Sequence, residues 1–246
     1  MERSVRVLDG AVAVFCAVGG VEPQSETVWR QADKYGVPRM AFVNKMDRIG
    51  ADFYNVCEMM RNRLGAHAVP MQLPVGAEDQ FVGIIDLVDM EARIWEGNDK
   101  DSPFTHGPIP EEYQEKAKEY REKMIEAIAD YDDDFAERFL GGDEFTKEDL
   151  HEGIRKATLA CSITPVFCGS AFKNKGVQML LDAVLEYMPS PPDVGAINGH
   201  NPTDDSEHMT REPKDDQPFS ALAFKVMRDP RGVDKLTYIR VYSGIL

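Results

Sequence analysis

Two apolar runs, each followed by a short polar turn, constrain the fold of this chain most strongly. Residues 40–43 (MAFV) precede 44–47 (NKMD), and residues 165–168 (PVFC) precede 169–171 (GSA). Apolar runs of this length are typical of strands in the buried parallel sheets of α/β proteins. Open α/β sheets bind their ligands at the carboxyl ends of parallel strands, so the two turns are predicted to share one binding edge.

The sequence also predicts a strand and a helix before this edge. Residues 11–18 form a nearly continuous apolar run, as expected of a strand covered on both faces. Pro23 and Ser25 begin a helix that reaches about Tyr35, and residues 36–38 (GVP) end it before the next strand. The pattern predicts a βαβ unit with a right-handed crossover.

The long interval between the two turns predicts an insertion. If the strands near 39–43 and 163–167 share one sheet, residues 50–161 form an inserted α+β subdomain large enough for its own core. Its pattern predicts a helix at 53–64, a small sheet within 69–95, a charged amphipathic helix over 111–139 and a last helix capped near Thr146. The acidic run 130–134 lacks the glycine and glutamate of a calcium loop and is interpreted as a solvated helix junction.

After the second turn the pattern changes to antiparallel strands. A helix is predicted over 176–187, and the Pro, Asn, Asp and Gly residues of 199–216 indicate a linker. Residues 219–226 and 236–242 alternate like half-buried strands joined by a turn at 229–232. The predicted domains are 1–49 and 162–198 for the parallel-sheet domain, 50–161 for the insertion, 199–216 for the linker and 217–246 for a second, β domain.

Composition excludes several classes of partner. The 246 residues carry a net charge of −15, which argues against DNA, other nonspecific phosphate backbones and anionic membranes, although local patches can still contact a ribosome. No apolar segment approaches the length of a membrane span. The four cysteines lack CxxC spacing and are interpreted as reduced core thiols of a cytosolic protein. The five histidines are never at metal-ligand spacing, so no metal site is predicted.

The residue types at the two turns suit guanine recognition. Guanine presents a ring N–H beside an exocyclic amine, so one carboxylate, here Asp47, can accept from both. Lys45 can lay its methylene stem along the base, while Asn44 can tie the turn to neighbouring backbone. The N–H of Ala171 would then donate to the guanine carbonyl, where adenine offers an amine. A four-residue pattern is short, and a solvated turn in an α/β protein of unrelated function remains an alternative.

Five separated motifs resemble bacterial elongation factor G. They occupy residues 2–12, 20–32, 44–48, 168–178 and 224–244, in the order of that family, and the insertion falls where that family carries one. The resemblance covers essentially the whole chain. It implies a guanine pocket formed by Asn44, Lys45, Met46, Asp47, Ser170, Ala171 and Phe172, whereas for Lys173 packing near the base and plain solvation are equally open.

The resemblance also implies a fold and an activity. The fold class is α/β: an incomplete P-loop-GTPase-type parallel sheet, an inserted α+β subdomain and the start of an antiparallel β-barrel domain. The parent would be a cytoplasmic, ribosome-dependent GTP hydrolase that binds GTP or GDP and moves tRNA and mRNA, or in a variant assists ribosome recycling. Its partners would be ribosomal RNA and the stalk proteins, toward which the insertion faces.

Phosphoryl transfer needs parts that this sequence does not show. It contains no GxxxxGK[ST] loop and no Asp-x-x-Gly-His segment. The chain is therefore expected to be a fragment that carries only the base-reading half of the site, without catalytic residues, with Mg²⁺ expected only in the intact parent. A non-catalytic module that binds stalk protein is the alternative, and uncovered edges of the β ribbon predict self-association.

Overall fold

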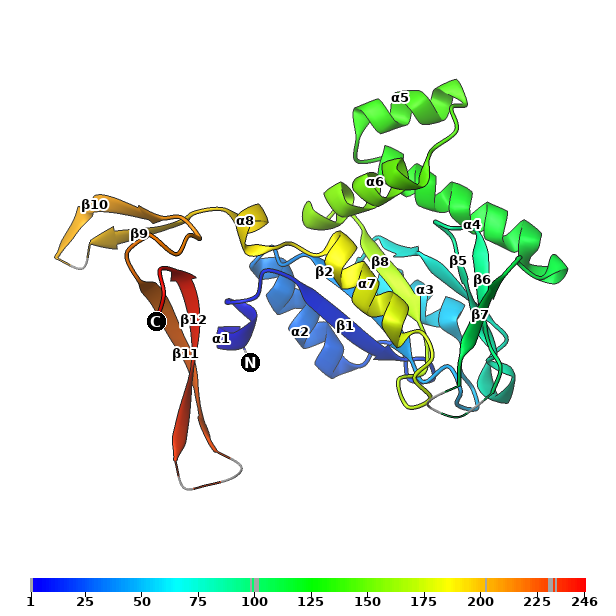
Figure 1. Ribbon diagram of the computed structural model, residues 1–246, viewed down its shortest axis with the longest axis horizontal. Helices are drawn as coiled ribbons and strands as arrows, with labels where there is room; N and C mark the ends of the chain where they lie inside the picture. Colours follow the sequence, from blue (N-terminus) through cyan, green and yellow to red (C-terminus); the bar gives the residue numbers. More distant parts are fainter. Residues whose placement is uncertain (1, 98, 100–101, 202, 230–231, 233) are drawn as a thin grey trace. The chain divides into compact units, whose positions relative to one another are not determined.

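The chain folds into two compact units. The computed structural model describes residues 2–97, 99, 102–201, 203–229, 232 and 234–246. One unit comprises Gly10–Met188, and the other comprises Met1–Asp9 together with Pro189–Leu246 (Figure 1). The N-terminal residues predicted to begin the parallel-sheet domain are thus grouped with the C-terminal segment. None of the described helices is both long and apolar enough to cross a membrane.

A four-stranded parallel sheet organises the larger unit. Its order is β1 (Ala11–Cys16), β2 (Arg39–Asn44), β8 (Thr164–Cys168) and β3 (Ala68–Pro70). β2 pairs directly with β8, with Phe42 opposite Phe167, so the prediction that these two distant segments share a sheet is confirmed. α2 (Pro23–Lys34) connects β1 to β2, beginning with a proline in its first turn and a capping box between Glu22 and Ser25.

The predicted coverage of β1 on both faces is wrong. Phe15 is buried and packs beside Trp29 of α2, with ring centroids 6.1 Å apart. Val14, which points to the opposite face, is 60% exposed. β1 is the edge strand of the sheet, so its apolar run reflects one covered face and one face open to solvent.

The insertion is smaller than predicted. α3 (Phe53–Leu64) ends at Gly65, which adopts the left-handed conformation with φ 64°, and the chain then enters β3 beside β8. Residues 53–70 therefore belong to the parallel sheet and its covering helices. A three-residue strand that contains a proline is too short for periodicity to identify, which explains the difference.

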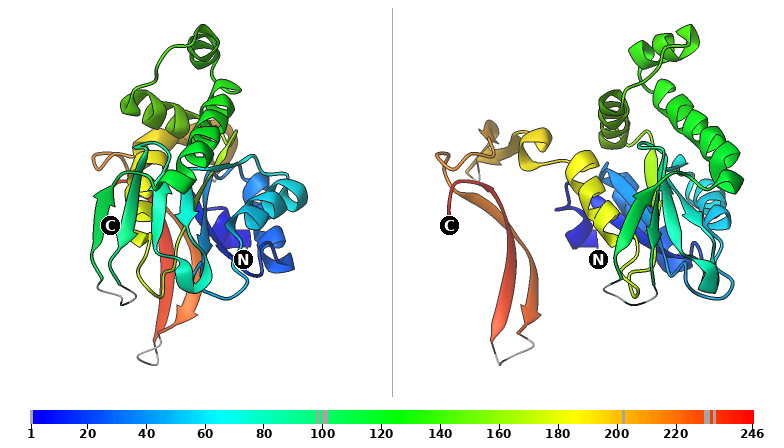
Figure 2. Two further views of the ribbon diagram at one scale, coloured as in Figure 1. Left: turned by 90° about the vertical axis from the view of Figure 1, so that its right-hand side faces the viewer. Right: turned by 45° about the vertical axis from the view of Figure 1, so that its right-hand side comes forward.

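The described residues of the inserted part proper form an antiparallel sheet and three helices. The sheet order is β4 (Gln72–Val75), β5 (Gly83–Asp86), β6 (Glu91–Trp95) and β7 (Phe104–Gly107), with the 3₁₀ turn η1 (Glu78–Gln80) between β4 and β5. α4 (Glu111–Ala129) runs beside this sheet and β3 (Figure 2). Among the described residues the core is continuous between the two sheets, and no separate core of the insertion is found there.

The predicted helix over 111–139 is two helices. α4 ends at Ala129, and α5 (Asp133–Gly141) begins where the Asp132 side chain accepts a hydrogen bond from the Phe135 N–H. The acidic run is thus a helix junction, as predicted, and no His, Cys, Asp and Glu cluster suited to a metal occurs among the described residues. α6 (Lys147–Leu159) begins at the predicted Thr146 cap, and α7 (Val177–Tyr187) follows the second turn.

In its described part, the smaller unit contains two antiparallel ribbons and two short helices. α1 (Glu2–Val5) begins it, and α8 (Pro191–Val194) precedes the strands. β11 (Ser220–Arg228) and β12 (Lys235–Ser243) pair as predicted, although residues 230 and 231 of the predicted turn lie outside the described part. Arg240 of β12 donates to both carboxylate oxygens of Asp9, at 2.6 and 2.7 Å.

The segment predicted as a linker contains a hairpin. β9 (Ile197–Asn201) pairs with β10 (Asp204–Arg211), so residues 199–216 are not wholly irregular. Strand pairing uses main-chain groups, and a ribbon exposed on both faces needs no apolar alternation. Its polar composition therefore gave no strand signal.

Candidate functional site

The first turn follows β2 and changes direction sharply. Lys45 adopts the left-handed conformation, with φ 69°, and its carbonyl accepts from the Arg48 N–H at 3.1 Å. The Asn44 side-chain oxygen accepts from the Lys45 N–H at 2.8 Å. These contacts close a tight turn at the carboxyl end of β2 and bring Asp47 to the edge of the sheet, half-buried.

The second turn follows β8 and depends on two glycines. Ser170 and Lys175 exchange main-chain hydrogen bonds of 2.9 and 3.0 Å, which close the loop between them. A Cβ on Gly169 would lie 2.3 Å from the Lys175 carbonyl oxygen. Gly176 has φ +84°, and a Cβ there would lie 2.5 Å from the Cys168 carbonyl oxygen. Only residues without a Cβ fit this close approach.

The two turns are joined directly. The Asn44 side-chain oxygen also accepts from the Ala171 N–H at 2.9 Å, and the Met46 N–H donates to the Gly169 carbonyl at 3.1 Å. Because β2 and β8 are neighbours, segments more than a hundred residues apart form one continuous edge. This is the topology in which parallel sheets place ligands.

The Ala171 N–H has an acceptor within the protein. That N–H was expected to donate to a guanine carbonyl, but here it donates to Asn44. The reason is local: the Asn44 oxygen lies close to the second turn and supplies an acceptor within the protein. Asn44 therefore joins the two turns through both the Lys45 and the Ala171 N–H groups.

The seven predicted side chains divide between the interior and the accessible edge. Met46 and Ser170 are fully buried, and Ser170 Oγ accepts from the Lys173 N–H at 3.3 Å. Ala171 and Phe172 are exposed, Phe172 by 73%. The half-buried side chains are those of Asn44, Lys45 and Asp47. Met46 and Ser170 thus contribute their main chains and the packing beneath the edge.

Asp47 presents an acceptor at this edge. Within the part of the chain that the structure describes, its carboxylate makes no hydrogen bond or ion pair with another side chain. Asp33, by contrast, binds Arg39 at 2.5 Å, and Asp149 binds Arg138 at 2.8 Å. A half-buried carboxylate that is not hydrogen-bonded to another side chain is suited to accept two N–H groups of a planar ligand.

A buried lysine beneath the site escaped sequence reasoning. Lys175 is 1% exposed, and its Nζ donates to the Phe81 carbonyl at 3.1 Å. Burial lowers the pKa of Lys175, nearby Lys173 lowers it further, and the charge of Asp47 opposes both effects. A lysine directly before the glycine that closes a turn gives only a faint sequence signal, which explains why sequence reasoning considered Lys173 but gave Lys175 no role.

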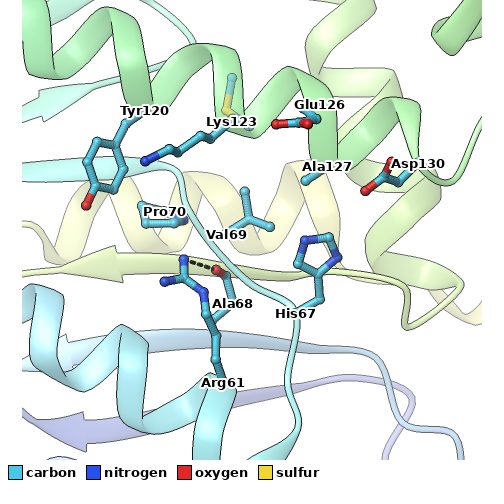
Figure 3. A pocket seen from close by; sticks show the side chains of 11 residues that line it. Arg61, His67, Ala68, Val69, Pro70, Tyr120, Lys123, Glu126, Ala127 and Asp130 are labelled. Carbon is cyan, nitrogen blue, oxygen red and sulfur yellow. Dashed lines mark hydrogen bonds between the residues drawn. The ribbon is translucent and has the colours of Figure 1, made fainter.

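A separate cavity lies away from these turns. It is a space of about 200 Å³ between α3, β3 and α4 (Figure 3). On one side of it Arg61 donates to the Ala68 carbonyl at 2.8 Å, while Tyr120 and Lys123 line the α4 side. The arrangement ties α3 to β3 and contributes no residue to the edge formed by the two turns.

The fold and this edge define a parallel α/β nucleotide-binding domain. Residues 1–190 match the family described as the elongation factor Tu GTP binding domain. The chain belongs to this family of translational GTPase domains. A crystal structure of a protein from Thermus thermophilus is similar over 99% of this chain, with a TM-score of 0.79 and 29% sequence identity. The chain spans 33% of the length of that protein.

Proposed function

We propose that this chain carries the guanine-reading part of the GTP site of a translational GTPase that resembles elongation factor G. The observation that supports this most is the Asp47 carboxylate, which is half-buried at the carboxyl end of β2 and makes no hydrogen bond or ion pair with another described side chain. Lys45 lies beside it in the same turn, and Asn44 joins that turn to the second one. Family membership supplies the ligand class, a guanine nucleotide.

The other parts of the reaction are proposed for the whole protein. The sequence contains no GxxxxGK[ST] loop, so contacts to the phosphates and Mg²⁺ are assigned to the parent protein. There the GTP cycle would drive translocation in the cytoplasm, with ribosomal RNA and stalk proteins as partners, or ribosome recycling in a variant. By itself this chain would bind the base weakly and would not hydrolyse GTP.

Titration with nucleoside monophosphates tests the proposal. Amide NMR spectra of the chain are recorded with increasing GMP, AMP or IMP, at millimolar concentrations. GMP is expected to shift the Lys45, Asp47 and Ala171 signals, and AMP is not. IMP lacks the exocyclic amine, so it should bind about tenfold more weakly than GMP, a loss of about 1.4 kcal/mol. Equal shifts from GMP and AMP would contradict the proposal.

Asp47→Asn gives a second, independent test. An asparagine amide can donate to the carbonyl that xanthine carries where guanine has its amine. The variant should therefore lose GMP binding and gain binding of XMP. Asp33→Asn, which changes a carboxylate of α2 instead, is the control and should leave the preference for GMP unchanged. An unchanged preference in Asp47→Asn would argue that the carboxylate does not read the base.

A further inference from the structure

The turn after β2 and the turn after β8 are called the base-reading turns below. The turn between β4 and β5, residues 76–82, contacts both of them. It closes through a hydrogen bond of 3.0 Å from the Val82 N–H to the Val75 carbonyl, and it contains η1. The Gly76 N–H donates to the Tyr113 hydroxyl of α4 at 3.0 Å. A Cβ on Gly76 would lie 1.9 Å from the Gln80 carbonyl, so the 76–82 turn is tightly wound and fixed to the inserted part.

Glu78 binds the first base-reading turn on both sides of Asp47. Its main-chain N–H donates to the Met46 carbonyl at 2.8 Å, and its Oε1 accepts from the Gly50 N–H at 2.7 Å. Glu78 has φ +59°, a left-handed conformation that residues with a Cβ rarely adopt. The surrounding contacts maintain this strained conformation, which is common where a local geometry serves a site.

The same 76–82 turn also holds the second base-reading turn. The Lys175 Nζ donates to the Phe81 carbonyl from a buried position. A buried ammonium group needs a well-placed acceptor, because the lost hydration must be replaced. Lys175 in turn exchanges main-chain hydrogen bonds with Ser170. Glu78 and Phe81 lie three residues apart in the inserted part. Glu78 thus supports the first base-reading turn, and Phe81 supports the second.

We infer that Glu78 is a positioning residue that holds the Asp47 carboxylate against the N–H edge of guanine. Through it, the inserted sheet sets the discrimination between guanine and hypoxanthine. The inference rests on the proposed guanine site and deepens it. Asp47 lies between two atoms that Glu78 binds, the Met46 carbonyl and the Gly50 N–H, so loss of the Gly50 contact frees one side of the Asp47 backbone.

A purely structural role would give a different result. If Glu78 only stabilised the fold, its loss would lower the melting temperature and weaken GMP and IMP binding by the same factor. A positioning role affects mainly the ligand that makes two hydrogen bonds to Asp47. The ratio of the GMP and IMP affinities therefore separates the two roles, because it cancels the fraction of folded protein.

The experiment compares Glu78→Ala, Glu78→Gln and the control Glu115→Ala by NMR titration with GMP and IMP. Glu115 pairs with Lys118 on the exposed face of α4, away from the turns. Glu78→Ala is expected to reduce the GMP to IMP affinity ratio at least about fivefold, toward unity, since the bidentate geometry is lost. Glu78→Gln keeps an oxygen acceptor for the Gly50 N–H and should restore most of the ratio.

The outcomes distinguish this inference from the proposed function. If the unchanged chain binds GMP no better than AMP, the guanine site itself is wrong and the inference is overturned with it. If the unchanged chain prefers GMP, but Glu78→Ala keeps the GMP to IMP ratio of Glu115→Ala, only the positioning role is overturned. If Glu78→Gln lowers the GMP to IMP affinity ratio as much as Glu78→Ala does, the hydrogen bond that Glu78 accepts from Gly50 does not position Asp47, and the inference fails.

Discussion

The side-chain oxygen of Asn44 accepts the Ala171 main-chain N–H at 2.9 Å, joining two turns that are 127 residues apart in the sequence. The same oxygen accepts the Lys45 N–H at 2.8 Å. One amide side chain therefore fixes the entry to the first turn and its spacing from the second.

Asn44→Ala is expected to loosen this edge. The substitution leaves the N–H groups of Lys45 and Ala171 without their acceptor, which costs about 1–3 kcal/mol of unfolding free energy where the groups stay shielded. Urea unfolding followed by the fluorescence of buried Trp29 measures the loss. The exposed Asn62, which donates to Glu58 on α3, supplies the control Asn62→Ala, expected to change stability by less than about 0.5 kcal/mol. Equal stabilities of the two variants would contradict the prediction.

Gly169→Ala is expected to disrupt the second turn. The new Cβ would lie 2.3 Å from the Lys175 carbonyl and 2.8 Å from the Phe42 ring, so main chain and core must both move. We expect a loss of more than about 2 kcal/mol, typical of overpacking against backbone. Gly107→Ala is the matched control, because no atom lies within 4 Å of its Cβ position. Thermal unfolding of both variants decides the question, and a Gly169→Ala protein as stable as Gly107→Ala would refute the prediction.

The parallel core of the fold was predictable because its signals are local and strong. Each of these signals depends only on a few neighbouring residues. They are the apolar runs of β2 and β8, the proline at the start of α2 and the Thr146 cap. The pairing of β3 with β8 was missed because a three-residue strand is too short for periodicity to place it in a sheet. The β9–β10 hairpin was missed because its exposed, polar strands lack an apolar period. The exposed face of β1 was missed for another reason: an apolar run does not reveal whether a neighbour covers it.

The candidate site was predictable in its residue types but not in its internal contacts. The sequence indicated Asp47 and Asn44 through the chemistry of guanine. It did not indicate that Ala171 would donate to Asn44, nor that the buried Lys175 would reach Phe81. The first contact depends on the pairing of β2 with β8, and the second depends on how the 76–82 turn folds back on the sheet edge. No periodicity of the chain encodes either approach.

The Asp149 carboxylate is expected to stabilise the folded state by an amount that depends on pH. Arg138 donates two hydrogen bonds to its carboxylate, at 3.0 and 2.8 Å, and Thr146 adds two more, which together hold the pKa of Asp149 well below its ordinary value of 3.8. A carboxyl group with a lowered pKa in the folded state stabilises it above the ordinary pKa and loses that contribution as the pH falls through the folded value.

Asp149→Asn should therefore melt at a lower temperature than the unchanged chain at pH 7, and the difference should shrink once the pH falls below 3.8. Calorimetry at both pH values checks the sign. Asp143→Asn, which changes a nearby exposed carboxylate that does not cap α6, is the control. A melting difference that grows on acidification would contradict the assignment of this ion pair.

The four cysteines should react with a thiol reagent in an order set by burial and local charge. Burial raises the pKa of Cys57 to about 12, and it also raises the pKa of the fully buried Cys168. Neither thiol therefore forms thiolate near neutral pH. At Cys16, partial burial raises the pKa, but main-chain N–H groups of Gly19 and Val18 and the nearby Lys45 outweigh it, leaving the pKa below its ordinary value of 9.0.

Iodoacetamide labelling mapped by mass spectrometry should therefore modify Cys16 first as the pH rises toward 9, because the thiolate is the reactive form. Cys161 is exposed, but its raised pKa should place it second. In urea all four should react at similar rates, which controls for intrinsic reactivity. Since Cys16 lies near Lys45, GMP should slow its labelling while AMP does not. Native labelling of Cys57 as fast as Cys16 would contradict the packing of α3, and equal protection by AMP would argue against a guanine-selective edge.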